Sequence, residues 1–349
     1  MNLKDLKKEH YESAELLVTD IPRREIALGV NIRAQCFNKP KDLAKVLAAR
    51  SNVEGAFAST AYYLDPHIKA HTKKGHLGTD LIFDVDAKPE RDRLNWLYDV
   101  CFRTSQLVDI LVHELGFKKE EMILDFSGNK GFHITIDNSE YKSLSKVDRT
   151  QLIHYITGEK VKRTDLAFGK GGWNKRFTSY LNNLASLMKN HSIDNPNANA
   201  KTLESLGLPK TTAKKLGDLM KQPTKRELLP KGRLGFLDAK SIASLQSHFF
   251  NQQKQGLQLV DKVCTTDMYR IFRIPGTIHP KTGFVSTRLH IDDIDNPAVI
   301  IDKVKRAGGL TMTTIDLEKE VTEDFDQVKV WPAGTHEVPR WLALHLLHQ

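Results

Sequence analysis

The sequence predicts an α/β (α+β) fold with an inserted helical subdomain, and two observations lead to this prediction. Up to about residue 140, segments with helical spacing of apolar residues alternate with short runs rich in β-branched or aromatic residues. From about 139 to 258 no strand-like run of comparable strength interrupts the helical segments, and strand-like runs return after 256. We therefore expect a core formed by residues 1–138 and 256–349, and a mainly helical subdomain over 139–255.

The individual elements follow in chain order. Apolar spacing predicts helices at 41–50 and 94–115, and Gly116 is a suitable C-cap for the second. Strands are predicted at LIFDV (81–85), MILDF (122–126) and FHITI (132–136). Further helices are predicted at RTQLIHYIT (149–157), SYLNNLASLMK (179–189), AKSIASLQSHFF (239–250) and, near the end, VPRWLALHLL (338–347).

Length and composition indicate a globular protein. The chain has 349 residues, of which 40% are hydrophobic and 27% charged, enough to bury a sizeable core. It has no run of 18 apolar residues, and MNLKDLKKEHYESAELL lacks the apolar stretch of a signal peptide. We therefore expect a cytoplasmic protein, or a nuclear one if the source is eukaryotic. Three scattered cysteines (Cys36, Cys101 and Cys264) predict reduced thiols rather than a disulfide framework or a four-cysteine zinc site.

The chain carries an excess of positive charge. Lys and Arg outnumber Asp and Glu 52 to 43, a formal charge of +9, and basic residues crowd between 159 and 235. Cations that contact phosphates release condensed counterions, so this balance favours a polyanionic partner such as nucleic acid. Many basic proteins bind no polyanion, and charge alone leaves both interpretations open.

The stretch LIFDVDAKP (81–89) places two carboxylates at the end of an apolar strand. Side chains alternate along a strand, so Asp84 and Asp86 share one face, roughly 7 Å apart, while Phe83 and Val85 point to the other. Two carboxylates this close repel each other unless a cation lies between them, and hard oxygen ligands suit Mg²⁺ or Mn²⁺. The pair therefore predicts a site for two divalent ions, and the alternative is a solvated strand end.

A second stretch, ILDFSGNKGFHITID (123–137), has a glycine-containing turn between two strand-like runs. Gly128 and Gly131 permit positive φ and close approach of the backbone to a ligand. The polar groups of the turn and of the strand face beyond it are Ser127, Lys130 and His133. These residues predict a phosphate-binding turn, and the alternative is an ordinary hairpin with a solvated histidine.

The third stretch is VDKVCTTDMYRIFRIPGTIHPKTG (260–283). We expect Thr265 or Thr266 to cap a short helix whose first turn holds Asp267 and which ends at Pro275 and Gly276. Within twelve residues the stretch holds four potential cations: Arg270, Arg273, His279 and Lys281. They predict a clamp for a triphosphate, to which Asp261 could add a third carboxylate, and the alternative is a surface cluster of charges.

In this order the three stretches resemble the small catalytic subunit of the archaeal and eukaryotic DNA primases. In that family an apolar strand ends in DxD, an SGxxGxH turn follows, and an Asp precedes an RxPxSxHxKTG segment. Here these are Asp84 and Asp86, residues 127–133, and Asp261 ahead of RIPGTIHPKTG. RREIAL, NIRAQCF, STAYYLDP and the terminal PAGTHEVPRWLALHLL extend the resemblance over nearly the whole chain, and TTDMYRIFRIPGTIH is closer to the archaeal form.

The resemblance implies a mixed-sheet primase core with flanking helices, and it implies roles for named residues. Asp84, Asp86 and Asp261 would bind two divalent ions, Mg²⁺ or Mn²⁺, with Asp267 as the rival third carboxylate. The implied nucleotide-binding residues are Ser127, Gly128, Lys130, His133, Arg273, His279 and, as a weaker candidate, Lys281. The family often carries Arg within the turn where this chain has Asn129 and Lys130, which weakens the case for bidentate phosphate contact there.

One feature of the family is missing from the sequence. Its members usually carry a small zinc-binding knuckle after DxD, whereas AKPERDRLNWLYDVCFRT (87–104) offers only Cys101. A tetrahedral structural zinc needs four Cys or His ligands, so we predict that structural zinc is absent, unless His71 or His76 contributes.

The resemblance implies an enzyme, the catalytic subunit of a DNA primase with DNA-directed RNA polymerase activity. It would synthesise short RNA primers on single-stranded DNA from NTPs by two-metal nucleotidyl transfer, paired with a primase large subunit. One alternative is a primase-polymerase or repair polymerase of the same superfamily that also incorporates dNTPs. Others are a phosphohydrolase and a non-catalytic nucleic-acid-binding subunit, in which we would expect a broken set of carboxylates.

Overall fold

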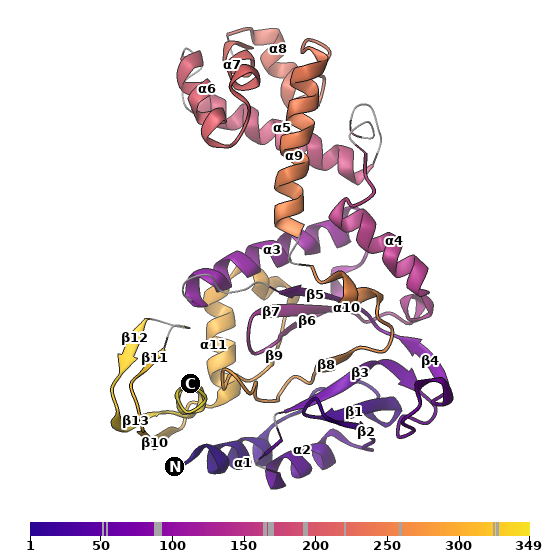
Figure 1. The fold of residues 1–349 in the computed structure, drawn as a ribbon, viewed down its shortest axis with the longest axis vertical. Coiled ribbons are helices and arrows are strands. Elements are labelled where there is room, and N and C mark those ends of the chain that lie inside the picture. Colours follow the sequence, from indigo (N-terminus) through magenta and orange to yellow (C-terminus); the bar gives the residue numbers. More distant parts are fainter. Residues whose placement is uncertain are drawn as a thin grey trace. The chain divides into compact units, whose positions relative to one another are not determined.

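The computed structural model describes residues 1–50, 52–53, 55–86, 93–162, 166, 171–190, 195–219, 221–257, 260–323, 325 and 328–349. The chain forms two compact units (Figure 1). One, the sheet unit, comprises 1–108, 117–153 and 259–349, and the other, the helical unit, comprises 109–116 and 154–258. Helices combined with antiparallel sheets confirm the α+β class, and all pairings among the described strands are antiparallel rather than mixed.

The first sheet of the sheet unit has the order β2-β1-β3-β4, and β8 also pairs with β3. Its strands are β1 (Arg24–Leu28), β2 (Ile32–Gln35), β3 (Ala56–Tyr63), β4 (His76–Thr79) and β8 (Ile271–Arg273). Beside it, α1 (Leu3–Ser13) packs along α2 (Pro40–Ala49), the helix predicted at 41–50 (Figure 1). β8, which contains Ile271 and Phe272, thus pairs with a strand that lies some 210 residues earlier in the chain.

The second sheet has the order β5-β7-β6-β9. It consists of β5 (Leu81–Asp86), β6 (Met122–Phe126), β7 (Gly131–Ile136) and β9 (Thr287–Leu289), and the first three confirm the predicted strands. Phe83, Val85, Phe126 and Phe132 are fully buried, as alternation along the strands predicts for the apolar face. Along the chain, α3 (Arg93–His113) follows β5 and α4 (Lys146–Thr157) comes after β7. The short α10 (Lys262–Thr266) precedes β8, and α11 (Pro297–Gly308) comes after β9.

The C-terminal segment adds two hairpin-like pairs and a helix to the sheet unit. β10 (Met312–Leu317) pairs with β13 (Gly334–Pro339), and β11 (Val321–Glu323) pairs with β12 (Lys329–Trp331). The predicted terminal helix is α12 (Arg340–Leu346), whose side chains from Trp341 to Leu346 are buried. Short 3₁₀ turns lie at Ile21–Arg23, His71–Lys73, Lys119–Glu121, Ser139–Ser143, Leu229–Lys231 and Ile291–Asp295.

A buried ionic network fixes the point where the chain passes from one sheet to the other. Asp80 separates β4 from β5, and its carboxylate accepts hydrogen bonds from Arg24 Nη2 (2.5 Å) and from the Tyr62 hydroxyl (3.0 Å). Arg149 donates to the carbonyl oxygens of Asp80 (2.9 Å) and Thr79 (2.6 Å). Because these groups are buried and paired, the start of β5 has little freedom to move.

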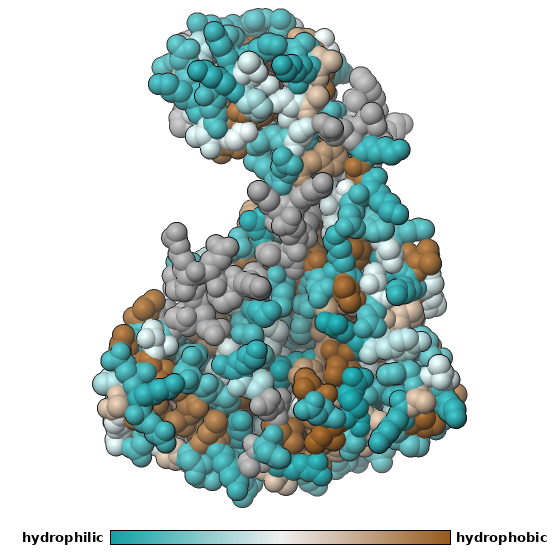
Figure 2. All heavy atoms as spheres, in the orientation of Figure 1, coloured by the Kyte–Doolittle hydropathy of each residue, from teal (hydrophilic) through white to brown (hydrophobic). Residues whose placement is uncertain are grey.

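The helical unit contains α5 (Gly172–Asn190), α6 (Pro196–Ser205), α7 (Lys210–Leu219), α8 (Pro223–Leu228) and α9 (Ala239–Leu257). Its core is aromatic and aliphatic, with Trp173, Phe177, Leu184 and Phe249 among the buried residues. Its surface is hydrophilic over most of the face seen in Figure 2. Exposed basic residues in the described part of this unit include Lys160, Lys162, Lys175, Lys201, Lys210, Lys214, Lys215, Lys221, Lys231, Arg233 and Lys240.

Among the described residues, no helix combines the length and the apolar character that crossing a bilayer requires.

Candidate active site

The carboxylates of the DVD stretch and the glycine turn are neighbours because β5 pairs with β7. In this register Asp84 lies opposite His133 and Asp86 lies opposite Gly131. A Cβ on Gly131 would lie 2.1 Å from the carbonyl oxygen of Val85, so only glycine permits this close pairing. The end of β5 therefore lies directly beside the turn that begins β7.

Asp261 reaches the same place through a single β-bridge. Val260 pairs with Val85, and the Asp261 N–H donates to the carbonyl oxygen of Asp84 at 2.8 Å. The Asp261 carboxylate also caps α10, because its Oδ1 accepts the N–H groups of Val263 (2.8 Å) and Cys264 (3.3 Å). Two carboxylates 177 positions apart in the chain are thus brought together.

The thiol of Cys264 lies between these carboxylates, which the sequence analysis did not predict. Its Sγ is 3.2 Å from Asp84 Oδ2 and 3.1 Å from Asp261 Oδ2. Among the described residues, Asp84, Asp261 and Cys264 form a group of potential metal ligands, with all three donor atoms within 4.8 Å of one another. Had Asp261 been recognised as a helix N-cap, helical spacing would have placed Cys264 on the first turn of that helix. Its contact with Asp84 could not have been predicted, because it depends on the bridge between Val260 and Val85.

The electrostatics of the carboxylates fit a bound cation. Burial raises the pKa of Asp84, an effect that nearby His133 opposes and the charges of Asp86 and Asp261 reinforce. Asp84 is 8% exposed, and its Oδ1 has no hydrogen-bond partner. For Asp261, burial alone would raise the pKa, but hydrogen bonds from Cys264 and from backbone N–H groups lower it. A buried carboxylate with further carboxylates nearby, and with one oxygen that lacks a hydrogen-bond partner, fits a divalent ion.

A pocket of about 190 Å³ collects most of the predicted nucleotide-binding residues. Its lining includes Asp84, Asp86, Ser127, Lys130, His133, Arg273 and His279, together with Arg270 and Cys264. Arg273 enters it from β8, opposite Phe57 of β3, and its guanidinium lies over the Phe57 ring at 4.6 Å. The pocket thus has carboxylates and cationic or neutral donors around one space, which is the polarity that a triphosphate with its metal ions requires.

Within the turn, Ser127 and Lys130 have defined partners. Ser127 Oγ accepts the N–H groups of Asn129 (3.4 Å) and Gly131 (3.2 Å), and Lys130 Nζ lies 3.0 Å from Asp86 Oδ2. Gly128 has φ +83°, and a Cβ there would lie 3.0 Å from His279 Cβ. Gly128 therefore allows the turn to pack on the segment that carries His279, although it does not itself line the pocket.

The predicted helix from Thr265 or Thr266 to Pro275 was wrong. The short helix α10 starts earlier, with Asp261 as its N-cap, and Asp267 follows it as the C-cap residue. The chain then becomes extended because 271–273 pairs with β3. Arg270 therefore lies directly before β8 and Arg273 at its end, and both line the pocket.

Four candidate residues are not part of the pocket lining: Gly128, Asp261, Asp267 and Lys281. Lys281 is exposed in the turn after His279, where its N–H donates to His279 Nδ1 at 3.2 Å. Asp267 accepts the Tyr269 N–H at 2.9 Å and is not in the group formed with Asp84. Of the two rivals for the third carboxylate, Asp261 is the one beside Asp84.

Among the described residues, those considered for structural zinc do not form a group of potential metal ligands. Cys101 is buried on α3, whereas His71 and His76 both lie near the Tyr269 ring, at 5.4 and 6.0 Å between centroids. Residues 87–92 of the expected knuckle region lie outside the described part of the chain. The absence of a structural zinc therefore stays a prediction.

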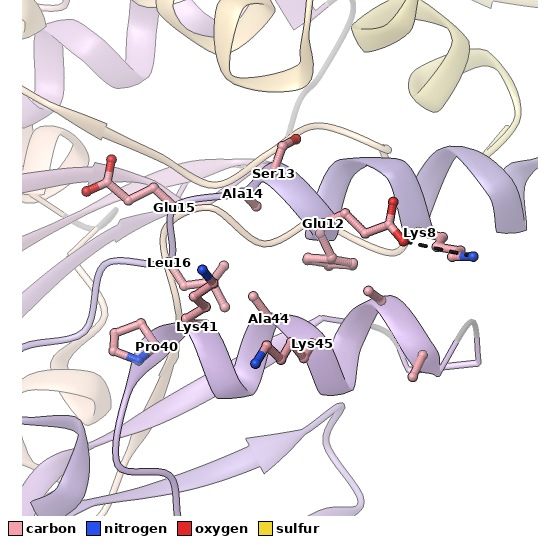
Figure 3. Close-up of a pocket in the computed structure, with 13 residues that line it drawn as sticks. Lys8, Glu12, Ser13, Ala14, Glu15, Leu16, Pro40, Lys41, Ala44 and Lys45 are labelled. Carbon is pink, nitrogen blue, oxygen red and sulfur yellow. Dashed lines mark ion pairs between the residues drawn. The ribbon is translucent and has the colours of Figure 1, made fainter.

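A larger hollow of about 770 Å³ lies between α1 and α2 (Figure 3). Its lining includes Leu16 and Ala44, and Lys8 pairs with Glu12 at 3.9 Å along it. None of the predicted site residues lines this hollow. Convergent polar groups identify a site for charged ligands better than volume does, and the smaller pocket has them.

The pocket thus brings carboxylates and cationic side chains together at the end of β5, an edge strand of the second sheet. The family model described as DNA primase small subunit matches residues 83–291, the span that carries all three motifs. The chain therefore belongs to the DNA primase small subunit family, a family of nucleotidyltransferases. This confirms the resemblance.

Relatives from archaea extend the similarity over nearly the whole chain. The DNA primase small subunit PriS of Picrophilus torridus is 28% identical, covering 97% of this chain and 93% of its own length. The PriS proteins of Methanosarcina barkeri and Methanococcoides burtonii are each 25% identical over 99% of this chain, and the match covers 94% and 96% of their lengths.

Proposed function

We propose that this chain is the catalytic subunit of a DNA primase that synthesises short RNA primers on single-stranded DNA from NTPs. The observation that carries the proposal is the single pocket lined by Asp84, Asp86, Ser127, Lys130, His133, Arg273 and His279. These residues come from three separate stretches of the chain. Their convergence is difficult to explain by packing alone, because it gathers charge in a partly buried place.

The carboxylates would act as the metal-binding side of the site. Asp84, Asp86 and Asp261 would hold two divalent ions, Mg²⁺ or Mn²⁺, which when bound lower the pKa of the primer 3′-hydroxyl and neutralise triphosphate charge. The β5–β7 pairing and the buried Arg149 contacts hold Asp84 and Asp86 in place before any ligand binds. This rigidity reduces the reorganisation that the reaction would otherwise require.

The opposite side of the pocket would orient the nucleotide. Arg273, Lys130 and His279 would contact phosphate oxygens, and the Ser127 turn would offer its backbone N–H groups. His133 Nε2 lies 3.7 Å from Asp84 Oδ1, so His133 can contact both the carboxylate and a phosphate near it. In-line displacement of pyrophosphate then needs no covalent bond to the protein.

The nucleic acid and the protein partner complete the proposal. The exposed basic residues of the helical unit would contact the template and primer backbones without reading sequence. Residues 1–138 and 256–349 would form the catalytic core, and 139–255 the subdomain that binds nucleic acid. A primase large subunit would support initiation, as in the family that the chain belongs to.

Primer synthesis on single-stranded DNA tests this function. The wild type, with and without added large subunit, should produce short RNA and pyrophosphate from NTPs. The double variant Asp84→Ala with Asp86→Ala should lose at least about 1000-fold, equivalent to several kcal/mol of transition-state stabilisation. The matched control is Asp109→Ala on α3, whose side chain is 73% exposed. Undiminished synthesis by the double variant would rule out the mechanism.

The same assay separates the rival functions. A primase-polymerase or repair polymerase would extend primers with dNTPs at least as well as with NTPs. A phosphohydrolase would release phosphate without any strand extension. A non-catalytic subunit would bind single-stranded DNA but give no product even when the large subunit is present.

A further inference from the structure

Cys264 occupies a position that neither the proposed two-metal mechanism nor core packing explains. Its thiol lies 3.2 Å from Asp84 Oδ2 and 3.1 Å from Asp261 Oδ2, and it is 4% exposed. Both carboxylates belong to the proposed catalytic site, so the sulfur lies within the site rather than behind it. In addition, Asp84 is 92% buried, and its Oδ1 lacks a hydrogen-bond partner.

The three side chains have the geometry of a metal site with one sulfur ligand. Zn²⁺ binds sulfur at about 2.3 Å and carboxylate oxygen at about 2.0 Å, so tetrahedral angles place sulfur and oxygen about 3.5 Å apart. The observed separations of 3.2 and 3.1 Å are a few tenths of an ångström shorter, so small side-chain adjustments would bring the three donor atoms to this geometry. All three donor atoms lie within 4.8 Å of one another.

We propose that Asp84, Asp261 and Cys264 form a three-ligand site for Zn²⁺, which competes with Mg²⁺ or Mn²⁺ for the carboxylates. Thiolate ligands select Zn²⁺ over Mg²⁺, which prefers an all-oxygen shell. On binding, the sulfur–zinc bond forms as the thiol proton leaves to solvent. Three protein ligands leave the fourth position open to water, unlike a closed structural site with four ligands.

The consequence for the enzyme is inhibition by Zn²⁺. With Asp84 and Asp261 held around one tetrahedral ion, they are withdrawn from the two-ion arrangement of primer synthesis. Asp86 is not a member of this group. Its Oδ2 lies 3.0 Å from Lys130 Nζ instead. The inference rests on the proposed function only for this inhibitory consequence; the metal site itself can be tested without catalysis.

Cobalt(II) provides the direct readout, because a thiolate bound to Co²⁺ gives a charge-transfer absorption that oxygen ligands do not. The experiment uses the full chain in a Cys36→Ser background, since Cys36 is the exposed free cysteine, whereas Cys101 is buried. Co²⁺ is titrated into this protein and into the same protein carrying Cys264→Ser or Asp86→Asn. Zn²⁺ is then added to displace Co²⁺ and give its dissociation constant.

We expect one charge-transfer band per chain in the background protein and in Asp86→Asn, and none in Cys264→Ser. Loss of a direct ligand should weaken Zn²⁺ binding by about 100-fold or more, at least the effect known for lost outer-shell partners. Circular dichroism establishes that each variant is folded. A band that persists in folded Cys264→Ser, or no band in the background protein, would overturn the proposal, whether or not the chain makes primers.

Discussion

The two compact units bury different kinds of side chain. In the sheet unit, Arg24, Asp80 and Arg149 are at most 7% exposed and are joined by hydrogen bonds around the start of β5. The helical unit has a core of aromatic and aliphatic residues, and its half-buried charges include the pair Glu114 and Arg176, 2.6 Å apart.

This difference indicates what each core does. A buried ion pair gains little stability over well-packed apolar residues, because desolvation offsets its attraction. The sheet unit nevertheless has the buried ion pair of Arg24 and Asp80 directly before β5. This strand carries Asp84 and Asp86, which would need fixed positions for the proposed chemistry. In the helical unit, apolar burial supplies stability directly. Substitutions of buried charges should therefore act on both the stability and the activity of the sheet unit, whereas apolar truncation in the helical unit should act on stability.

The largest expected effect separates the two roles of Asp261. Asn caps helices as well as Asp, so Asp261→Asn should keep α10 and the stability of the sheet unit, but it removes a metal-binding charge. We expect primer synthesis to fall by about 1000-fold, with a melting temperature close to that of the wild type. Asp267→Asn is the matched control and should retain activity. Equal losses in both variants would contradict the assignment of the third carboxylate.

The next effect tests the buried network. Arg24→Met leaves the Asp80 carboxylate without its closest cation and should lower the free energy of unfolding of the sheet unit by about 3–5 kcal/mol. Its neighbour Arg23, half-exposed and 3.8 Å from Asp20, is the control, and Arg23→Met should change stability by less than about 0.5 kcal/mol. Hydrogen exchange of β1 and β5 measures both. A small effect of Arg24→Met would mean that the network does not fix the sheet unit.

The helical unit should respond instead to apolar truncation. Leu184 is 3% exposed in its core, and Leu184→Ala should cost about 2–4 kcal/mol in local stability. Leu187, one turn along α5 and 37% exposed, is the control, with an expected cost below about 1 kcal/mol. Hydrogen exchange of α5 and α9 reports on this unit separately from the sheets. If Leu184→Ala abolished primer synthesis while the hydrogen exchange of α5 and α9 stayed unchanged, the proposed division of roles between the two units would be wrong.

A smaller effect concerns the two lysines predicted to contact the phosphates of a bound NTP. Lys130 lines the pocket and pairs with Asp86, whereas Lys281 is exposed in a turn. Lys130→Met should raise the KM for NTPs by about tenfold, equivalent to one charge-assisted contact, and Lys281→Met by less than about twofold. Steady-state kinetics with the same template compares them. The reverse order would favour Lys281 as the phosphate contact.

The smallest effect is a dependence of stability on pH in the sheet unit. Burial lowers the pKa of His10 to about 4, although the carbonyl of Gly276 accepts a hydrogen bond from its Nε2. The unfolded chain, with a histidine pKa of about 6.5, binds the proton first, so stability is lost as the pH falls from about 6.5 towards 4. From about pH 7.5 to 5.5 we expect a loss of about 1 kcal/mol. His10→Gln should reduce this loss, as measured by urea unfolding at both pH values; an unchanged slope would contradict it.

Much of the fold was predictable because local patterns reflect burial. The runs at 81–85, 122–126 and 132–136 are strands, and the helical spacing at 41–50 and 94–115 corresponds to α2 and α3. The segment 265–276 was mispredicted as helical, because Thr and Asp at its start resemble a cap. Tertiary pairing of Ile271–Arg273 with β3 overrides that local preference.

The sequence by itself determined the residue types and their order: DVD on an apolar strand, a glycine turn beside it, and a cluster of cations around Pro275. Only the tertiary structure decided which of them meet. The bridge between Val85 and Val260 brings Asp261 and Cys264 to Asp84, and the pairing of β8 with β3 brings Arg273 to the same pocket. Sequence spacing specifies neighbours only within a helix, strand or turn, whereas contacts over 180 positions depend on which strand edges remain free to pair.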